Sequence, residues 1–226
     1  MASPTKALAA SKRPDLAALV FGHFWFKMFG TMAYTFLFFV GYVYLLRHPA
    51  YPTATIPATW LDRAVTFQPL ALPAYLSLWF YVSLPPILMA TRAQIVAYGM
   101  RISVPCLFAF VVFYFWPNAV PPAHIDWALY PGVAFLKGVD AAGNACPSLH
   151  VATAVFSALW LHWRLQTLDA GAAVRALNIL WCVAIAYSTL ATKQHVAIDV
   201  CAGAALGFIA AWATRLRRHA ESISAR

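Results

Sequence analysis

The sequence predicts an all-α integral membrane protein, a polytopic helical bundle with about six transmembrane helices. Of its 226 residues, 62% are hydrophobic and 10% are charged, whereas a soluble domain carries about 25% charged residues. The apolar residues also gather in blocks close to the roughly 20 residues that a helix needs to cross a bilayer. The length leaves no room for a second domain, so we expect a single domain over 1–226 with its catalytic core at about 97–216.

The elements follow from the distribution of these blocks along the chain. Residues 1–15 are polar and basic, which indicates a cytoplasmic tail, and the aromatic-rich segment 16–27 is typical of an interfacial segment. The second predicted span should bend at Pro85 and Pro86. The six expected spans cover 28–46, 70–90, 97–116, 147–164, 174–191 and 195–216.

Two connections between spans are longer than the others. The first, 47–69, is rich in proline and threonine, and we expect a short helix in it around Trp60–Ala64. The second, 117–146, is the longest polar connection in the chain. A loop of that length is uncommon in a compact domain unless it has a function.

Lysine and arginine are distributed unequally between the two sides of the predicted bundle. The side that holds both termini carries eleven of them, and the opposite loops carry four: Arg47, Arg63, Lys137 and Lys193. The positive-inside rule then places both termini in the cytoplasm. We expect the protein to lie in a plasma membrane, such as a bacterial inner membrane. The net charge of +9 is explained by the orientation of the protein in the membrane, so we expect no nucleic-acid partner.

The four cysteines, Cys106, Cys146, Cys182 and Cys201, show no paired spacing. We therefore infer neither a disulfide framework nor a metal site, and we expect no cofactor. Cys146 could be a reactive thiol, although its place directly before a predicted helix explains it as well.

The chemistry-bearing residues centre on the run Ser188 to Asp199 at the junction of two apolar blocks. If the chain is helical from Val196, His195 and Asp199 lie one turn apart on the same face. The carboxylate can then accept the imidazole N–H, fix the tautomer and stabilise the imidazolium. The other ring nitrogen is left for attack, and ionisable groups at membrane depth are functional by default.

A second polar cluster, Cys146-Pro-Ser-Leu-His150, opens the fourth predicted span. The predicted topology places His150 at the same outer depth as His195. One imidazole can attack while the other protonates a leaving oxygen. The candidates for holding an anion beside them are Ser148, Ser188, Lys193 and Gln194, together with helix-start N–H groups.

These two clusters carry a resemblance to a known family. The residues 147–150 resemble the P-S-x-H signature of the type-2 phosphatidic-acid phosphatase superfamily. Ser188, His195 and Asp199 have the spacing of its last signature, S-R-x5-H-x3-D. The resemblance covers about 117–207, with the signatures in the family's order.

The resemblance implies a role for each matched residue. His195 would be the nucleophile that forms a phosphohistidine, Asp199 would orient it, His150 would be the acid for the leaving group, and Ser148 would bind phosphate. The substrate would be a lipid phosphate, met among the membrane lipids and processed without a metal.

The chain also departs from the family's pattern. Thr189 stands where the family has arginine, and the first signature, K-x6-R-P, is replaced by F-W-P-N-A-V-P-P-A-H at 115–124. These features, with Asp62, Pro69 and Tyr75, look more like the branch of inositol-phosphorylceramide and sphingomyelin synthases. Lys193 and His124 are candidates for the missing phosphate-binding charge.

We therefore expect a metal-independent lipid phosphatase acting on a phosphate monoester or diphosphate. A phospholipid headgroup phosphotransferase is the alternative. The histidines could instead be axial haem ligands of a redox subunit or merely satisfied polar residues between helices. Gly203 and Gly207 form a G-x3-G pattern, which favours close helix packing over dimerisation. Neither the lipid nor the oligomeric state follows from the sequence.

Overall fold

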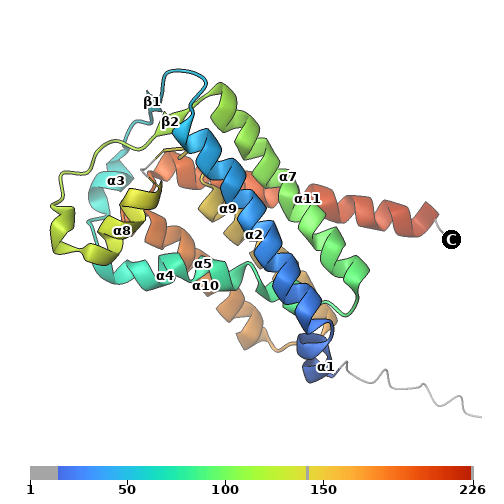
Figure 1. Cartoon of the computed structure of the whole chain (residues 1–226). Helices are drawn as coiled ribbons and strands as arrows, with labels where there is room; N and C mark the ends of the chain where they lie inside the picture. The colour runs from blue at the N-terminus through green and yellow to red at the C-terminus, as the bar shows by residue number, and fades with distance from the viewer. Residues whose placement is uncertain (1–14, 141–142, 225–226) are drawn as a thin grey trace, which may run out of the picture.

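The computed structural model describes residues 15–140 and 143–224, and it confirms an all-α bundle (Figure 1). In these residues the β structure is limited to a parallel pair of two-residue strands, β1 and β2, and an isolated bridge between Ala119 and Gly143. The elements in chain order are α1 (Leu16–Phe21), α2 (Phe24–Arg47), β1 (Ala54–Thr55), α3 (Trp60–Ala64), η1 (Pro69–Ala71), α4 (Leu72–Leu76), α5 (Leu78–Tyr81), α6 (Leu84–Ile87), α7 (Arg92–Phe115), β2 (Asn118–Ala119), η2 (Trp127–Leu129), α8 (Pro131–Asp140), α9 (Leu149–Thr167), α10 (Ala172–Ala191) and α11 (Ala197–Ser224).

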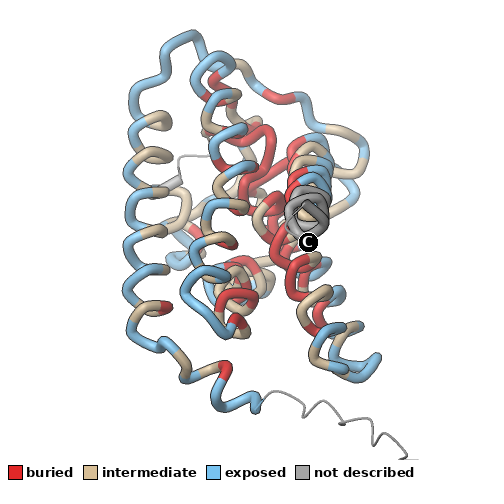
Figure 2. Tube along the Cα trace, turned by 90° about the vertical axis from the view of Figure 1, so that its right-hand side faces the viewer, coloured by how far each residue is buried: buried red, intermediate tan, exposed pale blue. Residues whose placement is uncertain are grey.

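Within the described part of the chain, five segments are long and apolar enough to cross a membrane. They are Phe24–Arg47, Pro69–Ile87, Arg92–Phe115, Ala172–Ala191 and Ala197–Arg215. The remaining expected span forms α9, a 19-residue helix that includes His150, His162 and Arg164. Because α9 is packed against α7, α10 and α11, its polar side chains face protein, and it forms the buried centre of the bundle (Figure 2).

The boundaries of several elements differ from the expected ones. The interfacial segment forms α1 and the first turn of α2, and the third span begins at Arg92. The second span is a chain of short helices, α4, α5 and α6, because it carries three prolines that cannot donate a backbone hydrogen bond. The fourth span does not begin at Pro147 as expected. Ser148 caps α9, so the proline lies outside the helix.

The helices α9 and α11 approach each other closely at two glycines. A Cβ at Gly203 would lie 2.3 Å from the carbonyl oxygen of Ser148, and a Cβ at Gly207 would lie 2.3 Å from that of Ala152. Any side chain there would overlap the backbone of α9. The G-x3-G pattern therefore serves packing within the chain, as the sequence favoured.

The connections that follow α2, α7 and α10 gather at one end of the bundle, which we call the loop end (Figure 1). There the loop before α3 pairs with the segment after α7 through β1 and β2. The short helix α3 lies where it was expected, at Trp60–Ala64. The loop end also holds the starts of α9 and α11, and so it brings the two predicted histidine signatures together. The expected tail, 1–15, lies outside the described residues except for Asp15.

Candidate active site

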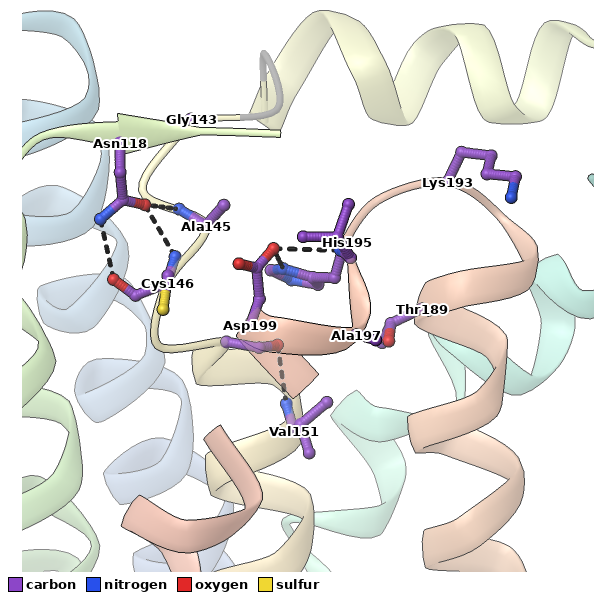
Figure 3. Close-up of polar contacts among 12 residues, drawn as sticks. Asn118, Gly143, Ala145, Cys146, Val151, Thr189, Lys193, His195, Ala197 and Asp199 are labelled. Atoms are coloured by element: carbon purple, nitrogen blue, oxygen red, sulfur yellow. Dashed lines mark hydrogen bonds and ion pairs between the residues drawn. The ribbon is translucent and has the colours of Figure 1, made fainter. Parts of the chain in front are cut away.

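The first half of the site is the start of α11, where His195 and Asp199 face each other (Figure 3). Nδ1 of His195 lies 3.5 Å from Oδ2 of Asp199. The same carboxylate oxygen accepts the backbone N–H of Val196 at 3.0 Å, which holds the side chain over the first turn. Asp199 is fully buried and His195 is 8% exposed. The structure thus forms the histidine–carboxylate pair that the spacing predicted, at ion-pair distance rather than as a short hydrogen bond.

The turn that presents His195 is folded back onto the end of α10. The carbonyl oxygen of Thr189 accepts the N–H of Gln194 at 3.0 Å and that of His195 at 3.1 Å. Lys193 closes the turn with φ of 56°, a left-handed conformation that costs energy for a residue other than glycine. Thr189, which stands where the family's pattern has arginine, therefore positions the segment that holds His195 through its main chain.

A second carboxylate, that of Asp62 in α3, ties the loop end to α11. Its Oδ1 accepts the N–H of Ala197 at 2.7 Å, and its Oδ2 accepts the N–H and hydroxyl of Thr59, each at 2.7 Å. The ammonium group of Lys193 donates to the main-chain carbonyls of Asp62 and Val65. Asp62 thus caps the helix two residues after His195 and fixes where that helix starts.

The second half of the site is the start of α9. Ser148 is fully buried, its hydroxyl oxygen accepts the N–H of Val151 at 3.2 Å, and its own N–H donates to the Asp199 carbonyl at 3.1 Å. Asn118 braces the segment before it, as Figure 3 shows. The Asn118 amide donates to the carbonyls of Trp116 and Cys146 and accepts the N–H groups of Ala145 and Cys146, all within 2.9 Å.

His150 follows in the first turn of α9 and is 9% exposed. Its imidazole stacks on the ring of Tyr75 from α4, with centroids 3.9 Å apart and planes 18° apart. This stacking restricts the rotation of the imidazole. Tyr75 therefore holds His150 in one orientation.

His150 and His195 line one cavity of about 810 Å³. Beyond the histidines the walls are largely apolar and aromatic, and they come from α2, α4–α7, α8 and the first turns of α9. Among the described residues that line the cavity there is no lysine or arginine. The cavity combines a small polar end with a long apolar remainder, the composition expected of a site for an amphiphilic ligand.

Several buried polar atoms around this polar end make no hydrogen bond within the described protein. They are Nε2 of His150, Nδ1 of His195, Oδ1 of Asp199 and both amide atoms of Gln194. A buried polar atom without a partner costs about 1–3 kcal/mol, and native proteins keep few of them. Their concentration in the two signatures makes this end of the cavity a candidate site for a polar ligand.

The structure does not bring all predicted phosphate-binding side chains to this place. The Ser188 hydroxyl donates to the Ile185 carbonyl at 2.6 Å, and Lys193 extends away from the His195–Asp199 pair in Figure 3. His124 is exposed in the connection between β2 and η2. None of the five predicted phosphate-binding side chains lines the cavity itself. Ser148, two residues before His150, and Gln194, directly before His195, are buried at the two helix starts.

Three positioning residues lay outside the reasoning from the two signatures. Asn118 was not identified, because an asparagine in a proline-rich loop has no feature that predicts burial. Asp62 and Tyr75 were noted only through the resemblance. Their roles depend on contacts with Ala197 and His150 that are distant in sequence.

Cys146 lies between Asn118 and the start of α9. Burial and, to a smaller extent, the negative charge of Asp199 together raise the pKa of its thiol to about 11. Because the thiolate is the nucleophilic form, this cysteine is protonated and unreactive at neutral pH. The structure therefore favours the packing role.

Two histidines on adjoining helix starts, one paired with a carboxylate, define a membrane protein with a site suited to acid–base and nucleophilic chemistry. A family model described as the PAP2 superfamily matches residues 16–222, so the chain belongs to that superfamily, as the resemblance predicted. Its members are phosphatases or phosphotransferases that act on lipid phosphates. Neither a curated protein nor a solved structure matches the chain.

Proposed function

We propose that the protein is a lipid phosphatase that cleaves a lipid phosphate monoester or diphosphate through a phosphohistidine on His195, without a metal. The observation that carries this proposal is the cluster of unpartnered buried polar atoms at the polar end of an apolar cavity. His195, Asp199 and His150 contribute to the cluster in the places that the family's signatures give them.

In the proposed first step, the His195 ring nitrogen remote from Asp199 attacks phosphorus. An N–P bond forms while the bond from phosphorus to the lipid oxygen breaks, and His150 gives that oxygen its proton. Asp199 stabilises the positive charge that develops on the His195 ring. In the second step, His150 takes a proton from water, whose oxygen attacks phosphorus and releases His195.

The phosphate oxygens would be held by groups at the two helix starts. The Ser148 hydroxyl accepts a hydrogen bond from Val151 and keeps its own hydrogen for a phosphate oxygen. The Gln194 amide supplies two further donors, and the helix start of α9 contributes partial positive charge. Ser188 would act through packing, because its hydroxyl is used within α10.

The test separates the roles of the two histidines. His195→Ala should abolish turnover and leave no phosphoenzyme after incubation with labelled substrate. His150→Ala should accumulate label, because attack can still occur while hydrolysis is slow. Label on His195→Ala and none on His150→Ala would exchange the roles, and label on neither would indicate direct attack by the acceptor.

A headgroup phosphotransferase is the second candidate, and the burial of the site favours it. Asp199 is fully buried, and His150 and His195 are 9% and 8% exposed, so water reaches the proposed phosphohistidine with difficulty. A lipid alcohol would then compete as acceptor. Incubation of purified protein with a lipid-phosphate panel, with and without alcohols, decides between them. Free phosphate alone supports the phosphatase, and new phospholipid formed at the expense of free phosphate supports the transferase.

We also propose that both termini are cytoplasmic, that the loop end faces the extracytoplasmic side of the plasma membrane and that the catalytic core is 97–216. The lysine and arginine asymmetry supports the orientation. Single cysteines in 121–126 should react with an impermeant reagent added from outside, whereas those in 166–171 should not. The reverse pattern would place the site in the cytoplasm.

A further inference from the structure

The cavity extends far beyond the space that a phosphate group needs. Its outer end lies near Tyr42, whose hydroxyl donates to the Gly143 carbonyl at 3.4 Å. Its wall follows α2 as far as Phe26. Phe26 lies sixteen residues before Tyr42 on α2, which at 1.5 Å per helical residue corresponds to about 24 Å. One leaflet of hydrocarbon is about 15 Å thick, so the cavity continues past the depth that an acyl chain of one leaflet reaches.

The helix α2 forms the outer wall along this length. Phe38 stacks on Phe110 of α7 at 5.5 Å, and Phe39 contacts Trp79 of α5 at 5.1 Å between centroids. At the inner end, Lys27 is the buried residue of α2, and its ammonium group donates to the carbonyls of Leu19 and Ile87. The cavity is thus walled by protein on the side where α2 lies.

Two glycines line the inner part of this cavity, Gly30 on α2 and Gly99 on α7. A Cβ at either position would meet nothing within 4 Å, unlike those at Gly203 and Gly207. Gly30 lies twelve residues below Tyr42, about 18 Å from the outer end. Gly30 therefore leaves the cavity open at a depth beyond one leaflet, and Gly99 leaves it open on the α7 side.

We propose that this inner part is a binding site for the end of a long hydrocarbon chain, and that it makes the protein selective for lipid phosphates with long chains. This inference rests on the proposed function for the position of the phosphate at His150 and His195. The occupant is the chain of the same lipid, because the apolar walls are continuous with the histidine end. The glycines at 30 and 99 keep the passage open.

The test compares Gly30→Leu and Gly99→Leu with wild type on a decyl and an eicosyl phosphate in detergent micelles. The decyl chain ends before the glycines, and the eicosyl chain passes them. Losing the burial of two methylene groups weakens binding by more than about tenfold. We expect kcat/KM to fall at least that much for the eicosyl phosphate and to stay within about twofold for the decyl phosphate. Gly138→Leu, an open position on α8 outside the cavity wall, is the matched control.

A second measurement keeps the inference separate from the proposed function. The affinities of decyl and eicosyl phosphonate, which have no cleavable ester, are measured by tryptophan fluorescence on the same variants. Chain-dependent loss of affinity without turnover of either phosphate would support the chain site and overturn the phosphatase. Equal affinity of the wild type for both phosphonates, or an unchanged ratio in both glycine variants, would overturn the chain site whether or not the protein turns over.

Discussion

Replacing Gly203 by alanine tests whether the contact between α9 and α11 sets the geometry of the site. The new Cβ would lie 2.3 Å from the Ser148 carbonyl oxygen, whereas ordinary contact begins at 3.4 Å, so the helices must separate by about 1.1 Å. The Ser148 N–H donates to the Asp199 carbonyl at 3.1 Å, and this bond would lengthen. A displacement of about 1 Å in an active site can cost about 10²-fold in rate.

The assay is kcat and KM on the lipid phosphate, together with thermal unfolding in detergent. Gly203→Ala should lower kcat about 10²-fold and destabilise the fold by about 1–3 kcal/mol through overpacking. Gly207→Ala makes the same clash with Ala152 one turn further along and should cost similar stability with a smaller loss of kcat. Gly138→Ala, where a Cβ meets nothing within 4 Å, is the control. Wild-type kcat in Gly203→Ala would refute the reasoning.

Four further outcomes are expected. Asp62→Ala should lower kcat more than it raises KM, because it removes a helix cap worth about 1 kcal/mol two residues after His195; a lower thermal midpoint with unchanged kcat would limit Asp62 to a role in folding. Activity should survive EDTA, and a metal-reversible loss would contradict the proposed mechanism. Alkylation of Cys146 should be negligible at pH 7 and rise towards pH 11, since its raised pKa keeps the thiol protonated; rapid labelling at pH 7 would contradict this. His150→Ala should recover much of a deficit of about 10²–10⁴-fold on a nitrophenyl phosphate, whose leaving group needs no proton, and no recovery would argue against the acid role.

The parts of the site that the sequence predicted are those set by local periodicity. His195 and Asp199 are four residues apart, so a helical start alone brings them together. The start of the fourth span beside His150 was predicted from the long apolar run, but it was placed at Pro147, whereas Ser148 takes the cap position. The capped helix at Trp60–Ala64 has the same origin.

The parts that could not be predicted depend on contacts between distant segments. The bond between Asp62 and Ala197 joins residues 135 positions apart, and the stacking of Tyr75 on His150 requires the broken second span to pass that helix start. Lys193 was a plausible anion ligand by charge. Its partners are main-chain carbonyls, and a sequence pattern does not reveal such partners.

The bonds of Lys27 have a consequence for biogenesis. One partner, Leu19, is eight residues earlier and is made before the lysine, whereas the other, Ile87, is made sixty residues later. When only the first span has been synthesised, the Lys27 ammonium group can bond to the Leu19 carbonyl but not yet to the Ile87 carbonyl. The first hairpin is complete only when the broken second span has been inserted. Lys27→Met should remove this dependence and let α2 insert without waiting for its neighbour.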